Sequence, residues 1–236
     1  MDHYTLSQRA LRVPATLVFG GVLLSLVVGF FHPDGPANDH AAAFAEYAHS
    51  GAWIAVHLGQ FVGMMVIVAG LLALCFVFTG QPRRSVWAAP FGAVAAVLAL
   101  GLYGVLQAVD GVALKHAVDA WMAAPDGEKA ARFASAEAVR WLEWGVRSYH
   151  TFVLGFSLFL FAGLMVRAGG VPRPIGYLMG VSGLAYIAQG WVLGVQGFSA
   201  ANGALTVAGI VLVFIWSVWL LWTVWRKRGA PPESGH

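Results

Sequence analysis

The sequence predicts an all-α integral membrane protein with six transmembrane helices, and three observations lead to this fold class. First, the 236 residues are 59% hydrophobic and only 11% charged, whereas soluble domains contain about 25% charged residues. Second, six apolar stretches approach the roughly 20 residues that a helix needs to cross a bilayer. Third, arginine-bearing joints separate alternate stretches, as expected for loops on one side of a membrane.

The first span is expected at 14–31, directly after Arg9 and Arg12. A signal peptide also begins with basic residues, but its apolar region has only about 7 to 15 residues. The apolar run of this span is longer, and no convincing small-residue cleavage site follows it. We therefore expect a helix that stays in the protein.

The other spans are expected at 52–79, 87–109, 148–166, 175–196 and 203–225. Stretches such as 66–78 and 207–222 are apolar at nearly every position. The strands of a membrane barrel instead alternate apolar and polar residues. Helices are therefore the expected structure in these spans.

Prolines in the short joints favour helix ends. Pro82 lies between the second and third spans, and Pro172 and Pro174 lie between the fourth and fifth. Because the six apolar stretches account for most of the chain, residues 1–228 are expected to form one membrane domain. Residues 229–236 are expected to be a disordered tail.

The segment 32–50, between the first two spans, is too long to be a mere turn. The sequence Pro33-Asp34-Gly35-Pro36 is typical of a turn. Asn38 or Asp39 is suited to cap a short alanine-rich helix that reaches His49.

A second long segment, 110–147, joins the third and fourth spans. Pro125-Asp126-Gly127 divides it into two stretches of helical pattern. Segments of this length are either functional or disordered. The two long segments thus have two interpretations, a lid over the bundle or solvated connectors.

Basic residues indicate the orientation of the chain. One side of the predicted spans carries nine of them: Arg9, Arg12, Arg83, Arg84, Arg167, Arg173, Arg226, Lys227 and Arg228. On the other side five basic residues mix with nine acidic ones. The positive-inside rule then predicts that both termini are cytoplasmic, in a plasma membrane of the bacterial inner-membrane type. These short clusters also explain the basic pI, so no nucleic-acid partner is expected.

Polar side chains inside the spans concentrate at the end predicted to be extracytoplasmic, and they follow the helical period. The four middle spans carry them: His57, Gln60, Gln107, Asp110, His150, Gln189 and Gln196. Spacings of three and four residues place those of each span on one face. Such groups are costly in a bilayer. We therefore expect the four middle spans to enclose a polar pocket that opens to the extracytoplasmic side, with the first and last spans packing around them.

His57 and His150 are the candidate cofactor ligands of this pocket. Imidazole is the commonest metal ligand and an axial ligand of many haems. The sequence leaves two cofactors open: a haem held by both histidines, or a divalent metal ion with a further ligand from Asp110, Glu143 or His116. Gln60, Gln107 and Gln189 are expected to lie around the ligands of either cofactor and to orient them by hydrogen bonds.

Two other interpretations of these polar groups concern contacts within the protein. His57 and His150 could simply donate hydrogen bonds to Gln107 or Gln189 across helices. We also expect Asp110 and Arg147 to form an ion pair across the mouth of the pocket, because both lie on the polar faces at that end.

Function is less determined than fold. The zinc-protease, P-loop, nucleophile-elbow and dinucleotide motifs are absent from the sequence, and the single Cys75 excludes an intramolecular disulfide. A redox or sensing protein with a haem or metal is the first hypothesis, and a small-solute transporter or ligand sensor is the second. The third is an accessory subunit whose Gly-x-x-x-Gly faces, at 59/63, 176/180 and 190/194, dock a membrane partner or a second copy. No catalytic residue is assigned.

Overall fold

The computed structural model describes residues 7–33, 38–79, 87–167 and 170–226, and every regular element there is a helix. Six helical segments are long and apolar enough to cross a membrane, which confirms the predicted fold class. The elements are α1 (Gln8–Gly29), α2 (His40–His49), α3 (Trp53–Thr79), α4 (Ala88–Ala108), the π-helix η1 (Val109–Leu114), α5 (Lys115–Met122), α6 (Asp126–Arg167), α7 (Arg173–Gln196) and α8 (Ala200–Trp225).

Some predicted features lie outside the described residues. They are most of the turn expected at 33–36, the joint 80–86 with Pro82, Arg83 and Arg84, and the tail 229–236.

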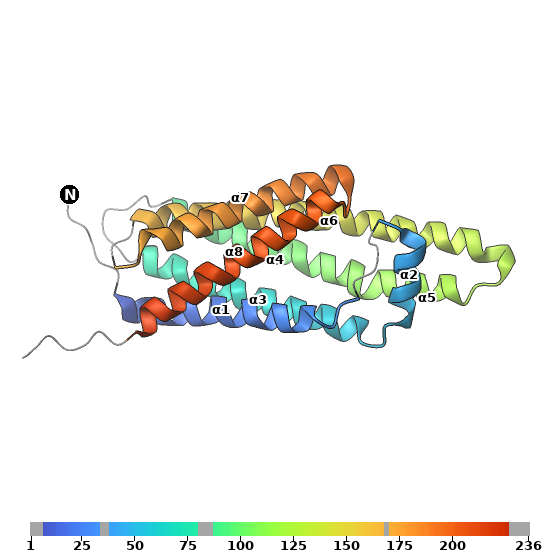
Figure 1. Ribbon diagram of the computed structural model, residues 1–236, viewed down its shortest axis with the longest axis horizontal. Helices are drawn as coiled ribbons and strands as arrows, with labels where there is room; N and C mark the ends of the chain where they lie inside the picture. Colours follow the sequence, from blue (N-terminus) through green and yellow to red (C-terminus); the bar gives the residue numbers. More distant parts are fainter. Residues whose placement is uncertain (1–6, 34–37, 80–86, 168–169, 227–236) are drawn as a thin grey trace, which may run out of the picture.

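The long helices form a closed ring in chain order. Figure 1 shows them running along the length of the molecule. Each of α1, α3, α4, α6 and α7 packs against the next, and α8 returns to pack against α1. The ring is closed by side chains near the two chain ends. Arg12 donates a hydrogen bond to the Val224 carbonyl (3.2 Å), and Trp225 Nε1 donates one to Thr16 Oγ1 (3.2 Å).

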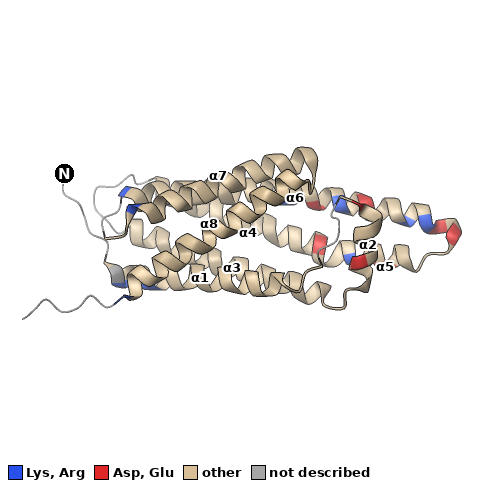
Figure 2. Cartoon of the chain, viewed as in Figure 1, with Lys and Arg blue, Asp and Glu red and all other residues tan. Residues whose placement is uncertain are grey.

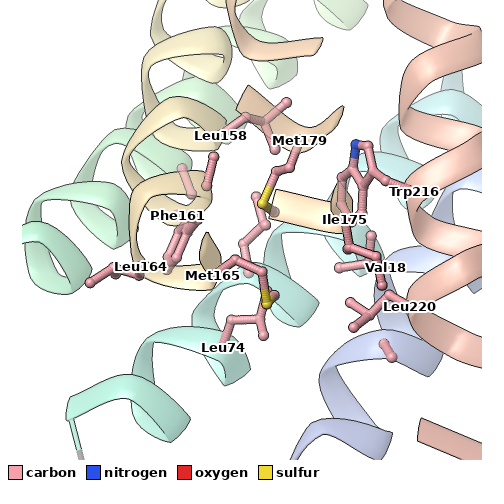
Figure 3. Close-up of a cluster of buried hydrophobic side chains, with 14 of the residues drawn as sticks. Val18, Leu74, Leu158, Phe161, Leu164, Met165, Ile175, Met179, Trp216 and Leu220 are labelled. Atoms are coloured by element: carbon pink, nitrogen blue, oxygen red, sulfur yellow. The ribbon is translucent and has the colours of Figure 1, made fainter. Parts of the chain in front are cut away.

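The interior of the ring is an apolar core (Figure 3). Buried side chains from all six long helices meet there, among them Val18, Leu74, Ala96, Phe161, Met165, Ile175, Met179, Trp216 and Leu220. Large apolar side chains also cover the outside: Phe76, Trp191 and Val207 are 77%, 70% and 62% exposed. An apolar surface of this kind suits contact with lipid.

Glycines allow two pairs of helices to approach closely. A Cβ built on Gly63 of α3 would lie 2.3 Å from Ser25 Oγ of α1, and one on Gly183 of α7 would lie 2.6 Å from the Gly155 carbonyl oxygen of α6. The Gly-x-x-x-Gly pairs of α3 and α7 face the same neighbours, α1 and α6. These glycines therefore pack against neighbouring helices of the same chain.

At one end of the bundle, α2, α5 and the first part of α6 extend beyond the ring (Figure 1). The predicted helix break is confirmed, since α5 ends at Met122 and α6 begins at Asp126. Asp39 caps α2 as predicted, accepting a hydrogen bond from the Ala42 amide (3.1 Å). A second apolar cluster fills this end: Ala43, Phe44, Tyr47, Trp53, Leu114, Val118 and Ala136. The outer segments thus form a packed helical cap.

Charged residues distinguish the two ends of the bundle (Figure 2). The end that holds the start of α1 and α7 shows only basic residues among those described: Arg9, Arg12, Arg167, Arg173 and Arg226. Acidic and basic residues mix at the end with the helical cap. This is the asymmetry on which the predicted orientation of the termini depends.

Candidate metal centre

Three potential metal ligands meet at the capped end of the ring. They are His57 of α3, Asp110 of η1 and His32, which follows α1. One donor atom of each lies within 4.8 Å of those of the other two. His57 and Asp110 are almost fully buried, at 2% and 1% exposure, while His32 is half-buried.

His57 stands in the second turn of α3 and is oriented by its own helix. Its Nδ1 donates a hydrogen bond to the Trp53 carbonyl (2.8 Å). In a neutral imidazole this bond leaves Nε2 with a free lone pair. Nε2 points at Asp110 Oδ2, 3.2 Å away. A hydrogen bond from the other ring nitrogen to a backbone carbonyl, as from Nδ1 here, orients histidine ligands in many metal sites.

His32 is oriented in the same manner by the chain beyond α1. Its Nδ1 donates to the Pro33 carbonyl (2.8 Å), so Nε2 again carries the lone pair. The ring centroid lies 5.4 Å from that of His57 and 5.0 Å from that of Trp53. Burial lowers the pKa of His32, which favours the neutral, metal-binding form at pH 7.

Asp110 lies in a π-helical turn between α4 and α5. Such wide turns are rare, and they are frequent at functional sites. The Trp53 indole donates a hydrogen bond to the Asp110 carbonyl (2.9 Å), which ties η1 to α3. A Cβ on the next residue, Gly111, would lie 2.5 Å from His57 Cβ, so this close approach requires glycine.

The two buried members of the cluster have polar atoms without hydrogen-bond partners. Within the described part of the chain, neither His57 Nε2 nor Asp110 Oδ1 has a hydrogen-bond partner. With the His57 proton on Nδ1, the Nε2 lone pair faces carboxylate oxygens that also carry only lone pairs. Such an arrangement requires a cation or an additional proton between the two groups.

Charged residues of α6 surround the cluster. Arg147 Nη2 lies 3.6 Å from Asp110 Oδ2, which confirms the predicted ion pair. Glu143 is fully buried and accepts a hydrogen bond from Arg140, and its Oε1 lies 3.8 Å from Arg147 Nε. The cluster, which includes the Asp110 carboxylate, thus has one further carboxylate and two guanidinium groups beside it.

The other predicted residues lie at different distances from this cluster. Gln107 Nε2 donates to Gln60 Oε1 (3.5 Å), which joins α4 to α3 one turn from Asp110. Gln189 instead donates to Thr206 of α8 (2.8 Å), because α7 packs against α6 and α8. His116 is exposed on α5.

His150 has surroundings of its own. Its Nδ1 donates to the Ala99 carbonyl (2.9 Å), and its ring lies 4.6 Å from that of Tyr103. The interpretation that His57 and His150 bind Gln107 or Gln189 is therefore wrong, since backbone carbonyls are their partners. Within the described part of the chain no contact joins His150 to His57, and a haem shared by the two remains a prediction.

Sequence reasoning missed two residues of the site, His32 and Arg140. Both stand outside the apolar spans, in the outer segments 32–50 and 110–147. The available signal for His32 was its position directly after the first span, at the same end as His57. No sequence signal separates Arg140, 2% exposed, from the exposed cations of the same helix.

Fold and site together define a membrane protein with a six-helix ring and a buried His–Asp cluster at one end. The chain belongs to the family described as Domain of unknown function (DUF4386), which matches residues 13–223 and thus includes the whole cluster. No curated protein and no solved structure matches the chain.

Proposed function

We propose that the protein binds a divalent transition-metal ion at His32, His57 and Asp110, for a redox or sensing role. The observation that carries this proposal is that His57 Nε2 faces Asp110 Oδ2 at 3.2 Å while Nδ1 donates to the Trp53 carbonyl. Two ligands bonded to one ion at about 2.1 Å are separated by about 3 to 3.4 Å. The ion would lie between these two groups and accept the Nε2 lone pair of His57.

The ligand types narrow the choice of ion. Two imidazoles and one carboxylate suit zinc, iron(II) or cobalt(II) better than calcium or magnesium. Three protein ligands leave at least one coordination position open, which is typical of reactive metal sites and not of structural ones.

We further propose that the site faces the extracytoplasmic side of a bacterial-type inner membrane, with both termini in the cytoplasm. The support is the excess of arginine at the opposite end of the bundle (Figure 2).

Metal loading of the purified full-length protein in detergent tests the proposal. After chelation and reloading with Co²⁺, we expect about one ion per chain and a visible cobalt absorption band. Asp110→Asn and His32→Asn should weaken Co²⁺ binding by about tenfold or more. The matched controls are His116→Asn and His49→Asn, which change exposed histidines at the same end.

Two results would overturn the metal-ion proposal. Wild-type protein that takes up no stoichiometric Co²⁺ or Zn²⁺ would favour the transport or accessory-subunit hypotheses. A haem band in the purified protein that disappears in both His57→Ala and His150→Ala would replace the ion by the haem predicted from the sequence.

A further inference from the structure

Among the described residues, Arg147 is the charged neighbour of the metal cluster that combines partial exposure with long contacts. Its side chain is 28% exposed, whereas the side chains alone of Asp110 and Glu143 are 2% and 1% exposed. Its distances to their carboxylates, 3.6 and 3.8 Å, exceed hydrogen-bond length, and Nε has no hydrogen-bond partner within the described ranges. The guanidinium therefore retains donors for another acceptor.

Phe198 lies beside this guanidinium and, more closely, beside that of Arg140. It belongs to the short α7–α8 connection, and its ring lies 5.2 Å from the Arg147 guanidinium carbon. Stacking on an aromatic face fixes the plane of the guanidinium at little cost in hydration. Arg147 thus stands between Asp110 and an aromatic ring.

Metal binding changes the charge balance around Arg147. A divalent ion held by two neutral imidazoles and one carboxylate keeps one positive charge, and Arg147 adds a second beside it. Glu143 accepts a hydrogen bond from Arg140, so its negative charge is already balanced by that guanidinium. Because buried charge without a counter-charge is costly, the loaded site favours a negatively charged ligand.

We propose that the open position of the metal ion takes a small anion, such as a carboxylate or another small oxyanion, and that Arg147 binds it. This inference rests on the proposed metal site. A guanidinium presents parallel N–H donors that match the two oxygens of a carboxylate. Arg147 acts here as a ligand-binding residue, and the substrate class of the site is anionic.

Anion titration of the Co²⁺-loaded full-length protein tests this inference, with sodium azide and sodium acetate as probes at constant ionic strength. Both should shift the cobalt absorption band in a saturable manner. Arg147→Gln should still bind Co²⁺ but bind azide about tenfold more weakly or worse. The matched control is Arg132→Gln on the same helix, which removes an exposed cation paired with Glu128 and should leave azide affinity unchanged.

The outcomes separate this inference from the proposed function. Absence of a cobalt band in the wild type contradicts the metal site itself. A cobalt band that azide and acetate leave unchanged, or equal azide affinity in Arg147→Gln and the wild type, overturns the anion inference alone. Should Arg147→Gln fail to fold, Arg147→Lys keeps the charge without the paired donors, and unchanged acetate affinity in that variant also overturns the inference.

Discussion

At the scale of single residues, the candidate site depends on a position that has no side chain. Gly111 lies against His57, and its missing Cβ permits the approach of η1 to α3. The separation of His57 from Asp110 is therefore set by how closely the backbones of η1 and α3 approach, as well as by contacts between the two side chains.

Gly111→Ala should lower the free energy of unfolding by about 1 to 3 kcal/mol, because the new methyl group overlaps the His57 side chain. It should also weaken Co²⁺ binding. Thermal unfolding and cobalt titration measure the two effects. Gly101→Ala is the control, since a Cβ there meets nothing within 4 Å, and it should be neutral or slightly stabilising. Equal behaviour of the two variants would contradict the role given to Gly111.

The Asp110–Arg147 pair should show energetic coupling in the metal-free protein. Removing either partner leaves the other charge beside a buried cluster, so a double-mutant cycle of Asp110→Asn and Arg147→Gln should give about 1 to 3 kcal/mol. Chemical denaturation of the four proteins supplies the cycle. A coupling energy below about 0.5 kcal/mol would mean that the two groups are independent.

Single residues of the site could be predicted where they break an apolar pattern. His57 and Asp110 stand out because the surrounding span is apolar, and helical spacing places them on the faces that meet. His32 could not be separated from loop residues by that criterion. The partner of His150 could not be predicted either, since the Ala99 carbonyl is a group that every residue possesses.

At the scale of elements, α2 is held over the site by the second apolar cluster. Phe44 is fully buried there, with ring contacts to Tyr47, Trp121 and Phe133. Tyr47 in turn packs on Trp53, whose carbonyl orients His57. The short outer helix is thus linked through aromatic packing to a metal ligand.

Phe44→Ala should destabilise the cap by about 3 to 5 kcal/mol, the usual cost of a large buried cavity. The expected signs are faster proteolytic cleavage around α2 and a lower unfolding temperature. Phe76→Ala is the matched control, because that ring is 77% exposed on the outside of α3. Protection from protease that is the same in both variants would show that α2 does not depend on this cluster.

Helix ends were harder to predict than helix existence. Hydropathy predicted a span ending at 109, yet helical structure continues through η1 and α5 to Met122, and α6 begins at Asp126, well before the predicted 148. Apolar composition indicates where lipid ends, and it carries no information on where the backbone stops being helical. Pro125 gave the correct break because proline acts directly on the backbone.

At the scale of the whole molecule, the number of spans was predictable and their lateral arrangement was not. Each span is a local apolar run that sequence displays directly. The contact of α1 with α8 joins residues about 210 apart in the chain, such as Arg12 and Val224, and no local pattern encodes it. The glycine faces were visible, but their partners inside the chain were not.

Reporter fusions test the orientation of the molecule. Fusions after Arg173 or Arg228 should report a cytoplasmic location, and fusions near Asp126 or Ala200 an extracytoplasmic one, because arginine-rich ends stay inside. Paired alkaline phosphatase and fluorescent protein reporters give opposite signals at each point. The reverse pattern would place the His–Asp cluster on the cytoplasmic side.

Closure of the ring by α8 also has a consequence for biosynthesis. The chain emerges from the ribosome N-terminus first, so α1 meets α3 early, whereas its other neighbour is the last helix to be made. Until then, the side of α1 that will receive α8 stays against lipid or the insertion machinery. A nascent chain that stops short of α8 therefore has an open seam beside its first helix, and a quality-control protease could recognise that unfinished edge.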